Sequence, residues 1–311
     1  MTPQTGSAQP GPLRLGTRRS LMATTQSQMV ADAYTERTGR EIELVGVTTF
    51  GDVTKAHLAQ LGGTGVFVSA LRDKLIEGEI DFAVHSLKDL PTKPDPRIAL
   101  AALPERHDHR DALVSRVKFA DLPAGARVGT GSPRRIAMLR ALRPDLDYVP
   151  IRGNADTRIG KVTSGELDAV VLASAGLTRI GRDAEISQIF EIEELLPAPG
   201  QGSLAVECLA DRADLVAFLG VLDDSRTRSA VAAERAVLAA LEAGCSAPVG
   251  AFALDDGHTL NLTAAVVAID GHRAVRKSAA GSPSEAEDLG RQLATRMLRE
   301  GADRLMGEHS H

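Results

Sequence analysis

The sequence contains no tryptophan and only two cysteines, and aromatic residues make up 3% of its 311 residues. So few aromatic side chains offer no stacking surface for single-stranded nucleic acid. The formal net charge of −5 also argues against a nucleic-acid-binding protein. Two cysteines, Cys208 and Cys245, do not suggest a disulfide framework, so we expect a reducing compartment, the cytoplasm.

Long apolar segments are also missing. No run approaches the roughly 20 residues that a membrane-spanning helix needs, so no membrane partner is expected. The first twelve residues, MTPQTGSAQPGP, lack the basic start and apolar core of a secretory signal. We interpret residues 1–12 as a disordered lead-in.

The remaining sequence alternates between patterns typical of strands and of helices. Strand patterns alternate with helical spacing up to residue 85 and again from residue 111, which predicts two α/β units with mainly parallel sheets. The expected strands of these units cover residues 13–17, 41–47, 81–85, 111–116, 147–153 and 168–177. A turn-rich return segment follows at residues 197–208. The last region predicts a helix over 226–243, three antiparallel strands within 249–281 and a final helix over 284–301.

The stretch DFAVHSLKDLPT, residues 81–92, contains the first candidate site. Ser86, Lys88 and Asp89 follow a short apolar strand directly. An aspartate there can simply stabilise its own turn. It can also be a catalytic carboxylate, because open α/β sheets bind ligands at the carboxyl ends of their strands.

Arginines recur at the same kind of position. In GTGSPRR, Thr130, Ser132, Arg134 and Arg135 join a strand to a helix, where free backbone N–H groups favour an anion. Surface salt bridges are the ordinary alternative for such a pair. Four further arginines also lie near expected strand ends: Arg18, Arg152, Arg158 and Arg179. Because the planar guanidinium suits carboxylates and phosphates, the set indicates a polyanionic ligand held between two domains.

The two cysteines differ in their surroundings. Cys208 lies in the apolar SLAVEC, where a small buried hydrophobic residue is expected. Cys245 lies in LEAGCSAPVG, after a helix stop and before a proline, so a loop position suited to covalent chemistry is expected. A lone cysteine without a neighbouring histidine is a weak signal for a nucleophile.

Six motifs in order resemble the porphobilinogen deaminase family, also called hydroxymethylbilane synthases. They are LRLGTRRS, GVFVSALRDKLIEGEIDFAVHSLKDLPT, VGTGSPRRIAMLRALRPDL, IRGNADTRIGKVTSGELDAVVLASAGLTRIG, LPAPGQGSLAVE and AAERAVLAALEAGCSAPVG. The resemblance implies an α/β fold with three domains. The first two resemble type II periplasmic binding proteins around a cleft, and the third is a small α+β domain with a three-stranded antiparallel sheet. We place them at residues 13–105 plus 201–222, 106–200 and 223–311.

The resemblance also implies an activity. Four porphobilinogen molecules are joined head to tail with loss of ammonia, on a dipyrromethane cofactor attached through a thioether, and hydroxymethylbilane is released for haem biosynthesis. Asp89 matches the catalytic aspartate and Cys245 matches the attachment site. No metal is implied. The matching cofactor- and substrate-binding residues are Arg18, Ser20, Ser86, Lys88, Thr130, Ser132, Arg134, Arg135, Arg152, Arg158 and Arg179.

Two positions depart from the family pattern. Many relatives place lysines near the positions of Thr64 and Ser69, which are neutral here. A solute-binding protein is the main alternative, since it shares the two-lobed architecture. The missing signal sequence and the cysteine-bearing third domain count against it, and reaction with Ehrlich's reagent would separate the two hypotheses. We expect a monomer that acts on porphobilinogen.

Overall fold

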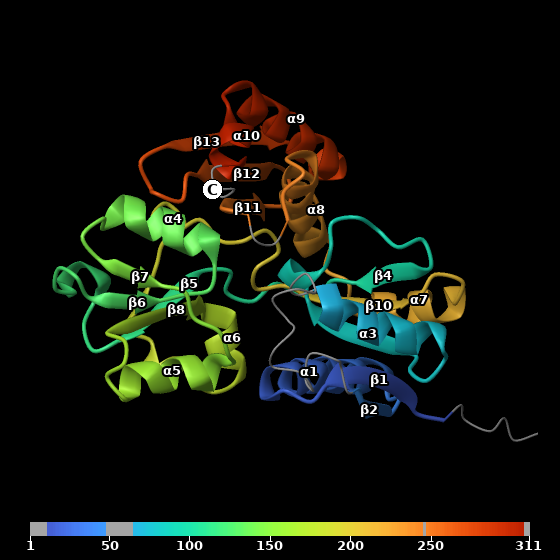
Figure 1. Ribbon diagram of the computed structural model, residues 1–311. Helices are drawn as coiled ribbons and strands as arrows, with labels where there is room; N and C mark the ends of the chain where they lie inside the picture. The colour runs from blue at the N-terminus through green and yellow to red at the C-terminus, as the bar shows by residue number, and fades with distance from the viewer. Residues whose placement is uncertain (1–10, 48–64, 245–246, 308–311) are drawn as a thin grey trace, which may run out of the picture.

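The computed structural model describes residues 11–47, 65–244 and 247–307, and the side chains from residue 68 onward in the second range. Three lobes meet at the centre of the molecule (Figure 1). Two of them each contain a five-stranded sheet, and the third contains a three-stranded sheet.

The first sheet has the strand order β2-β1-β3-β10-β4. β10 runs antiparallel to both of its neighbours, while β1, β2 and β3 are parallel, so four strands point the same way. The strands are β1 (Leu13–Arg18), β2 (Ile42–Val47), β3 (Phe82–Ser86), β4 (Ile98–Ala102) and β10 (Leu204–Leu209). The helices that pack on them are α1 (Leu21–Thr38), α3 (Gly65–Ile76) and α7 (Ala213–Leu219).

The second sheet repeats this arrangement with the order β7-β6-β8-β5-β9. Here β5 is the reversed strand. The strands are β5 (Asp111–Ser115), β6 (Arg127–Gly129), β7 (Asp147–Val149), β8 (Ala169–Ala173) and β9 (Gln188–Ile189). The helices are α4 (Pro133–Leu142), α5 (Ala155–Thr163) and α6 (Ser174–Arg179).

The chain crosses between the two sheets twice, from β4 to β5 and from β9 to β10. Each crossing delivers the one strand that runs against the others in its sheet. The mainly parallel sheets expected from the sequence are therefore confirmed, with one reversed strand in each. The shared strand order resembles the periplasmic binding protein fold, as expected.

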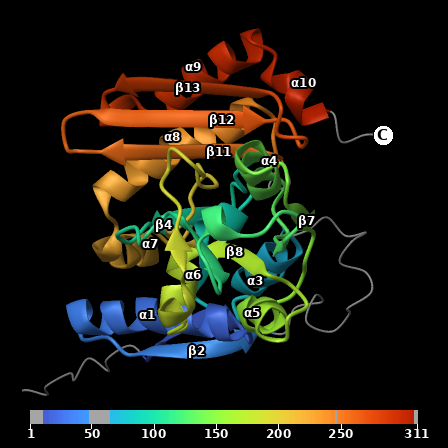
Figure 2. The same cartoon turned by 90° about the vertical axis from the view of Figure 1, so that its left-hand side faces the viewer.

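The third lobe is the expected small α+β unit. Its sheet, β11-β12-β13, is antiparallel throughout, and Figure 2 shows its strands side by side. Its strands and helices are β11 (Val249–Asp255), β12 (Leu260–Val267), β13 (Ala274–Gly281), α8 (Ser225–Ala240), α9 (Ala286–Arg299) and α10 (Ala302–Gly307). The helices cover one face and form a common apolar core with it. The domain boundaries proposed from the sequence stay predictions.

Three expected elements differ in the structure. The expected strand at 168–177 ends at Ala173, and α6 begins at Ser174, so Arg179 ends a helix rather than following a strand. The expected strand at 147–153 is only three residues long. The expected last helix is interrupted at Gly301, whose φ of +85° lies in the left-handed region. Small apolar residues in these stretches suit either type of element, so their pattern was a poor guide to boundaries.

Candidate active site

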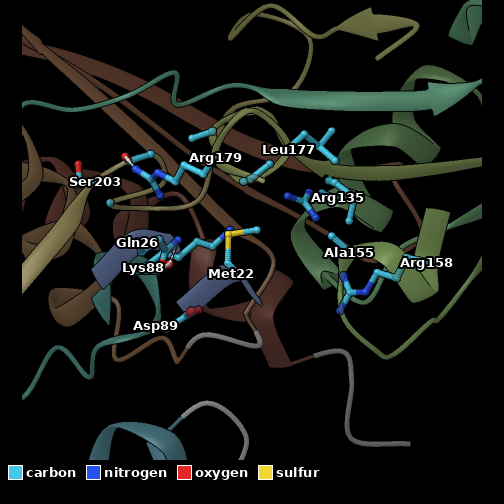
Figure 3. Close-up of a pocket in the computed structure, with 17 residues that line it drawn as sticks. Met22, Gln26, Lys88, Asp89, Arg135, Ala155, Arg158, Leu177, Arg179 and Ser203 are labelled. Carbon is cyan, nitrogen blue, oxygen red and sulfur yellow. Dashed lines mark hydrogen bonds between the residues drawn. The ribbon is translucent and has the colours of Figure 1, made fainter. Parts of the chain in front are cut away.

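Three cavities in the cleft between the first two lobes share Asp89 as a lining residue. Their volumes are about 210, 180 and 180 Å³. Figure 3 shows the first cavity, in which Lys88 and Asp89 face Arg135 and Arg158 from the opposite domain. The carboxylate predicted from strand position therefore lies where the cavities meet.

Asp89 reaches this position because β3 ends in a short 3₁₀ turn, η1 (Leu87–Asp89). The turn is tied to the crossing segment by a hydrogen bond from the Leu87 N–H to the Ser203 oxygen, 3.0 Å. Asp89 is partly exposed to the cleft but surrounded by protein. Burial raises the pKa of the Asp89 carboxyl, and the nearby charges of Lys88, Arg18 and His85 oppose that rise.

Lys88 lies beside Asp89 and lines two of the cavities. Its Nζ donates to Oε1 of Gln201 at 3.3 Å. Burial lowers the pKa of Lys88 to about 8, and the positive charge of Arg135 lowers it further, while the Asp89 carboxylate opposes this. The ammonium is thus poorly solvated, and a bound anion would stabilise it.

The paired arginines of the GTGSPRR motif are more deeply buried than an exposed anion site requires. Arg134 is 2% exposed and Arg135 is 6% exposed. Both pair with the buried carboxylate of Asp111, at 2.8 Å and 2.7 Å. Arg134 also donates to the backbone oxygen of Leu196, and Arg135 to that of Val171. Two guanidiniums share one carboxylate, so a net positive charge remains at the wall of the cleft.

Arg18, Arg158 and Arg179 complete the basic lining of the cavities. Arg179 donates from Nη2 to the Gly202 oxygen at 2.6 Å. Its Nε is buried and has no hydrogen-bond partner among the described residues. Burial lowers the pKa of Arg179 to about 10, so the group is still charged at neutral pH. These features suit an anionic ligand, whose carboxylates would offset the cost of burial.

Three predicted hydroxyl residues also line these cavities. Ser20 and Ser132 are the N-cap residues of α1 and α4, and each accepts a backbone N–H of its helix at 3.4 Å. Ser86 accepts a hydrogen bond from Nε2 of Gln26 at 3.1 Å. Both N-capped helices therefore begin at the cleft, where their N-termini favour negative charge.

Three predicted site residues are not placed in these cavities. Thr130 is 0% exposed and accepts the Ser132 N–H at 3.3 Å, so it supports the turn from below. Arg152 is exposed after β7 and lines none of the three cavities. Cys245 lies outside the described residues, as does Thr64. Gly244, which precedes Cys245, lines the second cavity.

Several lining residues were not predicted. Met22, Gln26 and Ser203 line the first cavity, and so do Gly200 and Gly202 of the PAPGQGS segment. Gly202 has a φ of +90°, and a Cβ there would come within 2.6 Å of the His107 oxygen. The glycines of PAPGQGS were the available signal for this segment, because the left-handed conformation favours glycine.

Two family models match the chain after this geometry is considered. The dipyromethane cofactor binding domain of porphobilinogen deaminase matches residues 13–217, and its C-terminal domain matches residues 229–299. The chain belongs to the porphobilinogen deaminase family. The family resemblance stated above is thereby confirmed, together with the transferase class and the dipyrromethane cofactor.

Characterised relatives agree over nearly the full length. The porphobilinogen deaminase of Thermobifida fusca is 60% identical and covers 96% of each chain. Porphobilinogen deaminase 1 of Streptomyces coelicolor is 57% identical over 96% of this chain and 98% of that protein. Among solved structures, the methionine binding protein MetQ is 11% identical over 68% of this chain and 89% of its own, with a TM-score of 0.44.

The expected state of Cys208 is confirmed. It is a free thiol on β10 with 0% exposure, and burial raises its pKa to about 11. Such a thiol is a poor nucleophile. Within the described ranges, none of the helices is long and apolar enough to cross a bilayer.

Proposed function

We propose that Asp89 is the catalytic carboxylate with which this member of the porphobilinogen deaminase family makes hydroxymethylbilane. The observation that carries the proposal is that Asp89 lines all three cavities of an arginine-lined cleft. Porphobilinogen carries an acetate and a propionate, and a chain of such rings carries many carboxylates. An arginine-lined cleft suits such a ligand.

Loss of ammonia from porphobilinogen leaves a cationic methylene-pyrrolenine. The Asp89 carboxylate stabilises this cation and accepts a hydrogen bond from the pyrrole N–H. Since burial raises the pKa of Asp89, the same group can give a proton to the departing amine and later take one from the ring carbon. Its neighbour Lys88 binds a substrate carboxylate beside it.

The dipyrromethane cofactor provides the pyrrole carbon to which the first substrate unit is joined. We propose that it is attached at Cys245 and held by the residues that line the cavities. Arg158 and Arg179 bind its carboxylates, and the N-termini of α1 and α4, capped by Ser20 and Ser132, add backbone donors. The buried unpaired Nε of Arg179 fits this role. The remaining predicted contacts, Arg18, Ser86, Arg134 and Arg135, border the same cleft.

Thr130 and Arg152 contribute differently in this proposal. Thr130 supports the anion-binding turn rather than touching the ligand, and Arg152 reaches the growing chain only outside the three cavities. We also propose that the protein acts as a monomer in the cytoplasm and has no nucleic-acid or membrane partner.

The test is to supply porphobilinogen and measure the release of ammonia and hydroxymethylbilane. The Asp89→Asn variant should lose nearly all turnover and still carry the cofactor. Asp95→Asn, which changes an exposed aspartate paired with Arg97, should be as active as the unmodified protein. Near-normal activity of Asp89→Asn would rule out the proposed role.

A further inference from the structure

Buried apolar residues anchor the segment that contains Lys88 and Asp89 on both sides. Leu87 is 0% exposed and Leu90 is 3% exposed, and both belong to a core cluster that includes Val231 of α8. Lys88 and Asp89, between these anchors, line the cleft instead. Apolar packing is non-directional, so it does not by itself set the orientation of the backbone between the anchors.

Arg235 of α8 supplies directional contacts to the same segment. Its Nη1 donates to the backbone oxygens of Leu87 at 3.4 Å and Leu90 at 3.1 Å. Its Nη2 donates to the oxygen of Pro91 at 2.6 Å. One planar guanidinium therefore holds three carbonyl groups, one before and two after Lys88 and Asp89.

The residue before Arg235 fixes α8 itself. Glu234 is 0% exposed. Its carboxylate accepts hydrogen bonds from Arg106 Nη1 at 2.6 Å, from the Gly200 N–H at 2.7 Å and from the Ala253 N–H at 2.8 Å. Arg106 and Gly200 lie in the two stretches that cross between the first two domains, and Ala253 lies in β11. Arg235 thus extends from a helix that is tied to all parts of the molecule.

α8 also leads toward the proposed attachment residue. The helix ends at Ala240, shortly before Cys245 in the sequence. Gly244 lines a cavity together with Lys88 and Asp89. We propose that Arg235 is a positioning residue that holds the Asp89 segment in a fixed place relative to a cofactor at Cys245. This inference rests on the function proposed above, and it assigns to the third domain a part in aligning the reaction.

The inference predicts a specific pattern of kinetic change in Arg235→Met, which keeps an apolar stem and removes all three contacts. We expect kcat to fall about 10- to 100-fold, since a displacement of about 1 Å at a reacting group can cost that much. KM should stay within about threefold, because Arg158 and Arg179 still bind the substrate carboxylates. The acid limb of the kcat profile should move to lower pH, because a loosened segment admits water to Asp89, and burial is what raises its pKa.

Arg228 provides a matched control on the same helix. Its Nη2 donates to the backbone oxygens of Leu100 at 3.4 Å and Ala101 at 3.5 Å, and it pairs with Asp223. Arg228→Met therefore removes the same kind of link between α8 and the first domain without touching residues 87–91. Both variants should unfold at lower urea concentration than the unmodified protein, and only Arg235→Met should change kcat and its pH profile.

The experiment measures kcat, KM, the pH profile and the intact mass for the unmodified protein, Arg235→Met, Arg235→Lys and Arg228→Met. The lysine variant keeps the charge but loses the fork, so its kcat should lie between those of the unmodified protein and Arg235→Met. If Arg235→Met does not fold, the lysine variant decides the question by the same two measurements.

Three results would overturn the inference. The first is a kcat and pH profile in the Arg235 variants equal to those of Arg228→Met. The second is a selective rise in KM, which would make Arg235 a substrate-binding residue. The third is a folded Arg235→Met protein without the cofactor mass, which would assign Arg235 to cofactor assembly. An inactive unmodified protein would instead contradict the proposed function, so the two failures are distinguishable.

Discussion

Asp111 and Arg135 form a buried ion pair, with 2.7 Å between Oδ1 and Nη2. Arg134 contacts the other carboxylate oxygen at 2.8 Å. This cluster joins β5, the reversed strand of the second sheet, to the first turn of α4. It orients the two arginines at the wall of the cleft, so the anion-binding surface depends on a carboxylate that does not itself line the cavities.

Replacing Asp111 with asparagine should destabilise the protein strongly. The substitution leaves two buried guanidiniums without their counter-charge, which typically costs about 3–5 kcal/mol. Urea unfolding of Asp111→Asn should show this loss. The control is Asp214→Asn, which breaks the exposed pair with Arg212 and should leave the unfolding midpoint nearly unchanged. Equal midpoints for the two variants would contradict the assigned role of Asp111.

The same pair predicts how stability depends on pH. Burial would raise the pKa of Asp111, but Arg134 and Arg135 outweigh it and bring the pKa down to about 2. Because the unfolded aspartate has a pKa near 3.9, the carboxylate stabilises the fold above about pH 4 and loses that effect as the pH falls toward 2. The stability difference between the unmodified protein and Asp111→Asn should therefore shrink over this range.

Lys88 predicts an alkaline limit on ligand binding. Since its pKa is lowered to about 8, the side chain loses its positive charge as the pH rises above that value. In protein prepared without cofactor, uptake of the cofactor should slow above about pH 8. Lys88→Arg keeps its charge over this range, so its uptake should not show that decline. Identical profiles for the two proteins would show that Lys88 does not bind the carboxylates.

Gly202 predicts a difference between two glycine substitutions. Gly202→Ala should destabilise the protein by about 2 kcal/mol or more, because its φ of +90° is unfavourable for alanine and the new Cβ would meet the His107 oxygen at 2.6 Å. It should also raise KM, since Arg179 donates to the Gly202 oxygen. Gly160→Ala is the control, because its Cβ would contact nothing within 4 Å and alanine favours the helix α5. Thermal unfolding should therefore separate the two variants in opposite directions.

Part of the site could be predicted from the sequence because it follows local patterns. Asp89 comes directly after a buried strand, and Ser20 and Ser132 occupy the N-cap positions of helices. These features are set by residues close in the sequence, so the position of Asp89 in the cleft needed little more than the strand order.

Other features depend on contacts between distant residues. The Asp111 carboxylate reads as the polar start of a strand, and nothing near it indicates that it pairs with Arg134 and Arg135. The three contacts of Arg235 join residues about 145 positions apart. The short α6 escaped prediction because SAGL continues the small and apolar composition of β8.

The intact mass of the purified protein tests the central claim most directly. The account predicts an added dipyrromethane on the unmodified protein and on Cys208→Ala, whose thiol is buried. It predicts none on Cys245→Ser, which should also be inactive with porphobilinogen. A dipyrromethane retained by Cys245→Ser, or an unmodified active protein without one, would contradict the account.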